Sequence, residues 1–214
     1  MHTIVLATQK GGSGKSTLAI GLALAAKQAG FTVRLIETDP QGTLSNWQRR
    51  RDADDLVVEP IYHAADIEPR LKMLADSGLQ LAIVDTAAGL SVARAWKRPY
   101  SFVLNQTPIR GQRIGNAANA LAEEAALDLT EVLARPLIVM RNDHQDSLAS
   151  GLAVSEFAPN GKSADEIHGL WRWIESRLEL TATINVLIDQ VISAADGMMH
   201  VTAEISDETT TLTS

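Results

Sequence analysis

The sequence contains a glycine-rich segment with two lysines, Lys10-Gly11-Gly12-Ser13-Gly14-Lys15-Ser16-Thr17. Before it, the apolar run at residues 3–7 predicts a buried strand, and after it the alanine- and leucine-rich residues 17–28 predict a helix. A strand, a glycine loop and a helix N-terminus in this order predict a phosphate-binding loop, because free backbone N–H groups and the helix dipole favour an anion there. In the general pattern Lys15 reaches the β- and γ-phosphates and the hydroxyl of Ser16 binds Mg²⁺.

The length and composition predict one α/β domain. At 214 residues with no cysteine, the chain can bury a large core but cannot form disulfides, thiolate zinc sites or iron–sulfur ligation. We expect a single domain over residues 1–204 and a polar, disordered tail over 205–214. No apolar stretch reaches about 18 residues, so we expect no membrane association and a cytoplasmic protein. The net charge of −7 argues against coating of nucleic acid by the whole surface.

Strands alternate with helices along the chain, which predicts a doubly wound, mostly parallel sheet with helices on both faces. Residues 32–37, 56–62 and 79–85 are expected to be strands, and residues 66–77 a helix. Asp39 follows the first of these strands and Asp85 ends the third, and ligands collect at such carboxyl ends in open parallel sheets. The alternatives are a turn aspartate before a proline for Asp39 and a helix N-cap for Asp85.

The second half of the chain is expected to continue the alternation. Residues 101–105 and 134–140 read as strands, and residues 111–124 and 164–178 read as helices. In the last of these, Trp171 and Trp173 are expected to pack in the core or at an interface. The stretch 181–199 is amphipathic but carries aspartates and no lysine or arginine, which argues against a membrane-targeting helix.

With K-G-G-S-G-K-S-T, E-T-D-P-Q-G and L-A-I-V-D-T in this order, the chain resembles the ParA/MinD family, and within it the small ParA-type partition ATPases. The resemblance runs to about residue 178, and the loop with Lys10 five residues before Lys15 matches the family's deviant Walker A motif, although Gln9 occupies the first position of the general pattern. It implies ATP and Mg²⁺ as cofactors, a homodimer formed on ATP binding, non-specific DNA binding, nucleoid association and a ParB-like partner that stimulates weak hydrolysis.

The resemblance also implies a role for each matching residue. Lys10 would reach the partner subunit's phosphates, Asp39 would orient the attacking water, and Asp85 would support Mg²⁺ through water. Asn105 matches an asparagine that contacts adenine, although a strand-end asparagine is also a common turn former. The remaining nucleotide-binding residues would be Gly11, Gly12, Ser13, Gly14, Lys15, Ser16, which also binds the metal, and Thr17, which holds the α-phosphate. Lys10, Lys15 and Asp39 would be the catalytic residues.

The chain departs from the family at three places. Glu37 stands where relatives have an aspartate, and Thr86-Ala87-Ala88-Gly89 stands where relatives commonly have T-P-P. Residues 90–100 leave no room for the strand and two helices that relatives place there. One strand–helix unit therefore looks absent near residues 89–92. Either the protein is a natural or engineered short form, or the printed sequence omits a segment of the full protein. Loss of a core strand would leave a hydrophobic face uncovered, which favours the second alternative.

Residues 86–122 contain no acidic residue but five cations, Arg94, Lys97, Arg98, Arg110 and Arg113. This asymmetry predicts a local basic surface for the phosphate backbone of DNA, and the alternative is a set of solvated charges. The run at residues 49–51 is expected to be a solvated helix end, since acidic residues follow it. The five histidines lack the spacing of metal ligands.

Together with these observations, the resemblance implies an ATP-dependent dimerising ATPase that positions plasmid or chromosomal DNA. Two alternatives remain open at this stage. The same enzyme class also includes ATPases that position protein cargo on the nucleoid. A non-hydrolysing, nucleotide-dependent regulator is the alternative from a different class.

Overall fold

The computed structural model describes residues 1–8, 11–86, 100–108 and 133–178. By internal contacts the chain divides into two units, residues 1–173 and residues 174–214. Only residues 174–178 of the second unit are described, so the account below concerns the first unit. The expectation of one domain to residue 204 with a polar tail stays a prediction.

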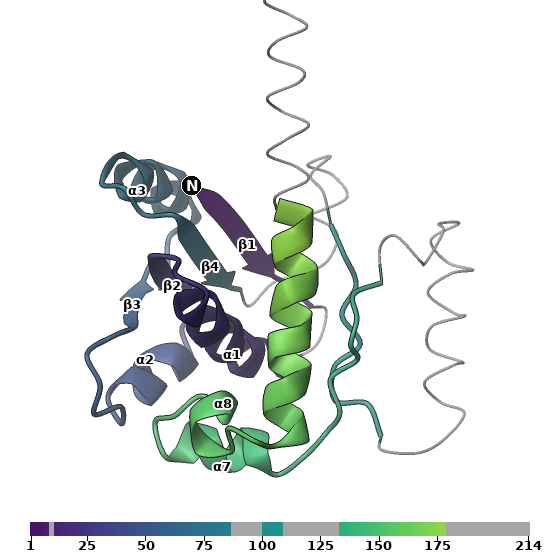
Figure 1. Cartoon of the computed structure of the whole chain (residues 1–214). Helices are drawn as coiled ribbons and strands as arrows, with labels where there is room; N and C mark the ends of the chain where they lie inside the picture. The colour runs from purple at the N-terminus through teal and green to yellow at the C-terminus, as the bar shows by residue number, and fades with distance from the viewer. Residues whose placement is uncertain (9–10, 87–99, 109–132, 179–214) are drawn as a thin grey trace, which may run out of the picture. The chain divides into compact units, whose positions relative to one another are not determined.

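Four parallel strands form the central sheet in the order β1-β4-β2-β3, as Figure 1 shows. They are β1 (His2–Leu6), β2 (Val33–Glu37), β3 (Val57–Pro60) and β4 (Leu81–Asp85). The register pairs Leu6 and Glu37 with Asp85, so the carboxyl ends of three strands meet at one edge. The α/β class with a mostly parallel sheet is thereby confirmed.

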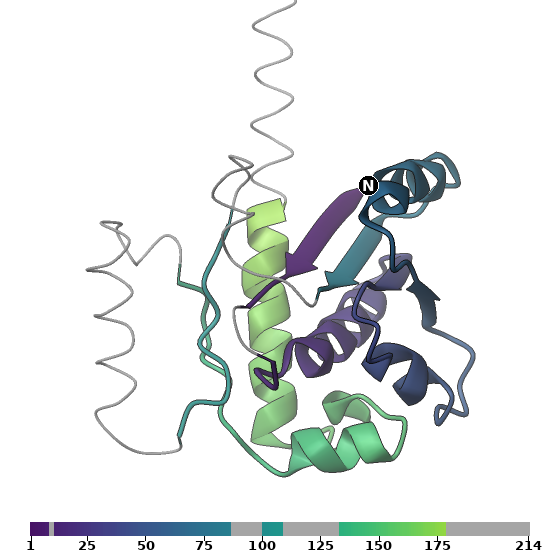
Figure 2. The same cartoon turned by 180° about the vertical axis from the view of Figure 1, so that it is seen from behind.

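Helices pack on the two faces of this sheet. On one face α3 (Ala64–Asp76) contributes Leu74 to an apolar cluster with Ile36, Ala82 and Val84. Because strand side chains alternate, Leu35, Leu81 and Ile83 face the other way, toward α1 (Lys15–Gln28), which contacts β2 and β4. Figure 2 shows the chain turning back from the carboxyl end of β1 into α1.

The middle of α1 is buried on every side, because a second helix packs against it. Residues 162–178 are helical, and within them Ile167, Leu170 and Trp171 are buried, as the spacing predicts. A Cβ added at Gly21 of α1 would lie 3.1 Å from Ile167, so this position needs a small residue for the two helices to approach. Trp171 also packs edge-to-face on Phe31.

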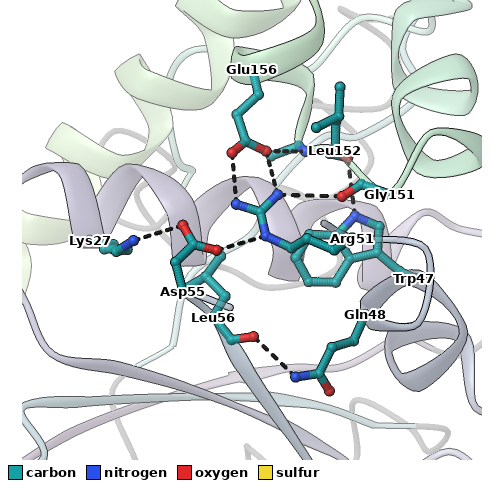
Figure 3. Close-up of polar contacts among 10 residues, drawn as sticks. Lys27, Trp47, Gln48, Arg51, Asp55, Leu56, Gly151, Leu152 and Glu156 are labelled. Carbon is teal, nitrogen blue, oxygen red and sulfur yellow. Dashed lines mark hydrogen bonds and ion pairs between the residues drawn. The ribbon is translucent and has the colours of Figure 1, made fainter. Parts of the chain in front are cut away.

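The arginine run at residues 49–51 differs from expectation. Arg49 and Arg50 are exposed, but the Arg51 side chain is only 1% exposed after α2 (Thr43–Gln48). Its guanidinium donates to both oxygens of Glu156 at 2.7 Å and to Asp55 at 2.7 Å, as Figure 3 shows. The buried charge of Arg51 is therefore compensated by a carboxylate 105 residues away in the chain, which local composition could not reveal.

This cluster ties α2 to the short helices α7 (Asp143–Ala149) and α8 (Val154–Phe157). The Trp47 indole N–H donates to Leu152 O at 3.1 Å, and the Arg51 guanidinium lies 5.2 Å from the Trp47 ring centroid. Arg51 also donates to Gly151 O at 3.3 Å (Figure 3). The connection after α2 is consequently anchored to the α7–α8 region by both charged and neutral hydrogen bonds.

The two strands expected at residues 101–105 and 134–140 are not formed as regular strands. Instead, isolated parallel bridges pair Phe102 with Leu133 and Thr107 with Val139. Hydrogen bonds from Ala134 N to Phe102 O and from Ile138 N to Leu104 O hold the two segments side by side. The two segments do pair, but the pairing is interrupted between the bridges, so the prediction of two regular strands is wrong.

Among the described residues β1 pairs only with β4, and Val5 on β1 is 51% exposed. An apolar β1 side chain this exposed is what an uncovered sheet face would show. Residues 89–92 lie outside the described part, so the absent strand–helix unit stays a prediction. The helix expected at 111–124 and the amphipathic stretch at 181–199 lie outside it as well.

Candidate functional site

The glycine loop connects β1 to α1 at the carboxyl edge of the sheet. Gly12 and Gly14 have left-handed backbones, with φ of 71° and 80°, and α1 begins directly after them at Lys15. A side chain at Gly14 would be strained by this φ, and its Cβ would lie 2.6 Å from the Asn105 amide nitrogen. The loop conformation thus depends on glycine, and it places the start of α1 where its free N–H groups suit an anion.

Polar side chains of the loop contact one another and the end of β1. The Lys15 ammonium donates to the Thr8 hydroxyl at 3.4 Å, and the hydroxyls of Thr8 and Ser13 are hydrogen-bonded at 3.0 Å. Thr17 follows on the first turn of α1 and is half-buried. The predicted residues from Gly11 to Thr17 therefore lie on one loop-to-helix junction.

The Ser16 hydroxyl donates to Asp85 Oδ2 at 2.5 Å, which joins the loop to the end of β4. Asp85 is only 1% exposed, and burial raises the pKa of its carboxyl. The Ser16 hydrogen bond and the nearby Lys15 charge oppose this rise, while the charges of Asp39 and Glu37 add to it. Three carboxylates and one ammonium are thus close enough to influence one another electrostatically.

The site fits a divalent cation in one specific respect. Asp85 Oδ1 is buried and has no hydrogen-bond partner among the described residues, although a buried carboxylate oxygen normally has one. Hydroxyl and carboxylate oxygens are the donors that Mg²⁺ takes, together with water and substrate phosphates. Within the described ranges no group of three or more acidic, histidine or cysteine side chains could hold a metal. The Ser16 hydroxyl and the Asp85 carboxylate are donors of the kind that Mg²⁺ takes.

Asp39 lies in the turn that follows β2. Its Oδ1 accepts a hydrogen bond from Gln41 N at 3.0 Å, and its carbonyl accepts one from Gly42 N at 3.1 Å. The preceding Thr38 is bound through both N and Oγ1 to Asp85 O, each at 3.0 Å. The backbone next to Asp39 is consequently fixed to the strand that ends in Asp85.

Glu37 lies next to the candidate site and makes contacts that could not be predicted from the sequence. It is fully buried at the end of β2, and its carboxylate accepts hydrogen bonds from Leu44 N at 2.6 Å, from Ser45 N and from the Ser45 hydroxyl. The two N–H groups are among the free backbone donors at the start of α2. Glu37 thus holds the far end of the loop that carries Asp39.

Asn105 and Gln106 come from the interrupted bridge segment and contact the glycine loop. The Asn105 amide donates to Ser13 O at 2.8 Å, and the Gln106 amide donates to Gly12 O at 3.0 Å. One N–H group of the Asn105 amide is thus already bound to the loop. The expected contact of Asn105 with adenine stays a prediction. No motif singles out Gln106 in the sequence.

Several predicted residues lie outside the described part of the chain. These are Lys10 and the basic set Arg94, Lys97, Arg98, Arg110 and Arg113. Their predicted roles toward a partner subunit and toward DNA stay predictions. Of the helices in the described ranges, none combines the length and apolar character needed to cross a membrane.

A parallel α/β sheet with this glycine loop, Ser16 and Asp85 at its carboxyl edge defines a phosphate-loop nucleotide-binding domain. The family assignment follows from comparison with known proteins. The chain belongs to the family described as the CobQ/CobB/MinD/ParA nucleotide binding domain, whose model matches residues 4–209.

Similar proteins agree with this assignment. The chain is 33% identical over 131 residues to a chromosome partitioning protein ParA of Caulobacter vibrioides, over 50% of this chain and 48% of that protein. It is 32% identical over 105 residues to a Thermus thermophilus protein named "Probable plasmid-partitioning protein ParA", over 48% of this chain and 32% of that protein. The matches therefore span about half or less of these relatives.

The fold is also similar to that of solved structures. One is a putative plasmid partition protein of Borrelia burgdorferi bound to AMPPNP, with a TM-score of 0.56 and 15% identity. The similarity covers 82% of this chain and 98% of that one. At this identity the comparison supports the fold, and the MinD/ParA type of architecture is confirmed.

Proposed function

We propose that this protein is a Mg²⁺-dependent ATPase that dimerises on binding ATP, associates with DNA without sequence preference and positions plasmid or chromosomal DNA. The observation that carries the proposal is the Ser16–Asp85 hydrogen bond at the base of the glycine loop, with the unpartnered Asp85 oxygen beside it. Membership of a nucleotide-binding family and the partitioning role named for two relatives support it.

The side chains suit phosphoryl transfer to water. Mg²⁺, held by Ser16 and by Asp85 through water, would neutralise charge on the phosphates. Lys15 binds the β- and γ-phosphates, and the N–H groups of the loop surround the remaining oxygens. Asp39 orients the attacking water, and the hydrogen bonds of Thr38 and Glu37 keep its loop in place. No protein nucleophile is required, because positioning and electrostatics supply most of the rate enhancement.

Turnover of ATP by the purified protein tests this function. We expect slow Mg²⁺-dependent hydrolysis that rises when non-specific DNA and a ParB-like partner are added together, and Lys15→Ala should abolish it. Failure of the wild type to bind ATP would overturn the proposal. Tight ATP binding with no turnover under any of these conditions would indicate a non-hydrolysing regulator instead.

The role of Lys10 across the dimer has a separate test. Lys10→Ala should retain ATP binding and lose ATP-dependent dimerisation, whereas Lys15→Ala should lose both. Light scattering with and without ATP measures the oligomer, and nucleotide titration measures binding. An ATP-dependent dimer in Lys10→Ala would refute the role in trans.

DNA association is proposed to involve Arg94, Lys97, Arg98, Arg110 and Arg113. Contacts of this kind release counterions, so affinity should fall linearly on a log–log plot against salt, with a slope of about −0.9 for each phosphate neutralised. Replacing Arg94, Lys97 and Arg98 with glutamine should make this slope shallower by about 2 to 3. An unchanged slope would place the DNA surface elsewhere.

A further inference from the structure

Gln106 has a backbone conformation that is unusual for a residue with a side chain. Its φ is 55°, and it is the only residue other than glycine with a positive φ among those the structure describes. A left-handed backbone is costly for such a residue and persists when the surrounding structure imposes it. Strain of this kind at the edge of a ligand site calls for a physical cause.

Hydrogen bonds on both sides of Gln106 impose this conformation. Before it, Leu104 O accepts from Ile138 N at 2.9 Å, and after it Thr107 donates to Ile138 O through N at 3.0 Å and through Oγ1 at 3.1 Å. The neighbouring Val139 N donates to Glu166 Oε2 at 2.9 Å. Residues 105 and 106 therefore form a kink whose two ends are anchored to a second segment.

The kink brings two neighbouring side-chain amides onto the glycine loop. In an extended strand these side chains would point to opposite faces, but here Gln106 reaches Gly12 O at 3.0 Å and Asn105 reaches Ser13 O at 2.8 Å. Gln106 N donates to Asn105 Oδ1 at 2.8 Å, which orients the first amide. Successive loop carbonyls are thus bound, while no hydrogen bond from the N–H groups of residues 12–14 is found within the described part of the chain.

We propose that Asn105 and Gln106 form an amide clamp that preorganises the glycine loop, with Gln106 as a positioning residue for polyphosphate binding. By holding the carbonyls of Gly12 and Ser13, the clamp leaves the loop N–H groups for the phosphate oxygens. It also removes conformational freedom that the ligand would otherwise have to restrict. The part of this inference that concerns ATP rests on the function proposed above.

Two substitutions separate the clamp from a structural role. Gln106→Gly removes the amide but adopts the left-handed backbone without strain, so stability should be retained or increased while ATP affinity falls. Gln106→Asn tolerates the same φ but has an amide one methylene shorter, and it should weaken ATP binding similarly. One lost neutral hydrogen bond corresponds to about a 3- to 10-fold higher Kd for ATP. The matched control is Gln145→Ala, at an exposed position of α7, which should leave Kd unchanged.

The experiment combines three measurements on the full chain: the Kd for ATP, the thermal midpoint without nucleotide, and NMR backbone order parameters of the loop without nucleotide. Lower order parameters at residues 11–14 in Gln106→Gly, with an unchanged or higher thermal midpoint, would support the clamp even if the wild type bound no ATP. Unchanged order parameters would overturn the clamp. If the wild type binds ATP and Gln106→Gly binds it with the same Kd, the clamp has no role in ATP binding. The proposed ATPase function would remain intact in that case.

Discussion

Replacing Asp85 with asparagine should stabilise the nucleotide-free protein and abolish its function. Asp85 is buried, one of its oxygens accepts from Ser16 at 2.5 Å, and the other has no partner among the described residues. Burial, together with the charges of Asp39 and Glu37, raises the pKa of this carboxyl. The charge is therefore unfavourable in the fold until a cation offsets it. Asparagine keeps an oxygen for Ser16 and places an uncharged N–H₂ group where the unpartnered oxygen lies.

The size of the effect follows from the unpartnered oxygen. A buried polar group without a partner costs about 1–3 kcal/mol, and more when it is charged. The substitution cannot remove this whole free-energy cost, because the asparagine amide must find hydrogen-bond acceptors in the same space. We therefore expect Asp85→Asn to raise the free energy of unfolding by about 1–2 kcal/mol. For a chain of this length that corresponds to a rise in the thermal midpoint of about 2–8 °C.

Thermal unfolding followed by circular dichroism measures this rise, and phosphate release measures activity. With Mg²⁺ and ATP at about 100 times Kd, the free energy of unfolding of the wild type should rise by about 2.7 kcal/mol. That of Asp85→Asn should rise much less, and this variant should not hydrolyse ATP. The matched control is Ser16→Ala, which leaves both Asp85 oxygens without a partner. It should lower the thermal midpoint, although it also removes a metal ligand.

The two variants thus move stability in opposite directions while both abolish hydrolysis. A lower midpoint for Asp85→Asn in the absence of nucleotide would refute the reasoning, because it would mean that the carboxylate is already compensated. An equal response of wild type and Asp85→Asn to Mg²⁺ and ATP would instead refute the metal role of Asp85.

Three further predictions concern the Arg51 cluster and the loop that carries Asp39. Arg51→Ala should lower the free energy of unfolding by about 2–3 kcal/mol in urea titrations. This is somewhat below the range for fully buried ion pairs, because the Glu156 side chain is 26% exposed. The control Arg49→Ala, at an exposed position, should lower the free energy of unfolding by under about 0.5 kcal/mol. The Arg51 hydrogen bond lowers the pKa of Asp55 from 3.8 to about 2, with Lys27 assisting. The contribution of the Asp55 carboxylate to the free energy of unfolding is fully present above about pH 4 and is lost as the pH falls toward 2. In urea titrations across that window the free energy of unfolding should therefore fall by up to about 1 kcal/mol more in the wild type than in Asp55→Asn. Glu37→Ala should lower kcat by about 10- to 100-fold and leave the Kd for ATP nearly unchanged, because it releases the loop that carries Asp39. An equal change in kcat and Kd would refute the idea that Glu37 acts through this loop alone.

The positions of Asp39 and Asp85 could be predicted because they depend on local patterns and on one general property of parallel sheets. Apolar runs locate β2 and β4, and parallel pairing brings their carboxyl ends together whatever the loops contain. The same reasoning located α1 after the glycine loop. It was less accurate at residues 101–105 and 134–140, where β-prone composition produced isolated bridges. Composition reports that a segment suits pairing, whereas continuous pairing also requires the backbone to stay extended, which Gln106 prevents.

Residues that act on a partner distant in the chain or on a backbone group are a different case. Glu37 binds the N–H groups of Leu44 and Ser45, Gln106 binds a carbonyl 94 residues away, and Arg51 binds a carboxylate 105 residues away. Backbone groups carry no residue identity, so a side chain that binds them leaves no matching signal elsewhere in the sequence. Nucleotide ligands, by contrast, demand particular side chains at particular spacings, and for that reason a motif shows them. The contacts of Glu37 and Gln106 follow from the fold itself, and they join the Asp39 loop and the glycine loop to neighbouring groups.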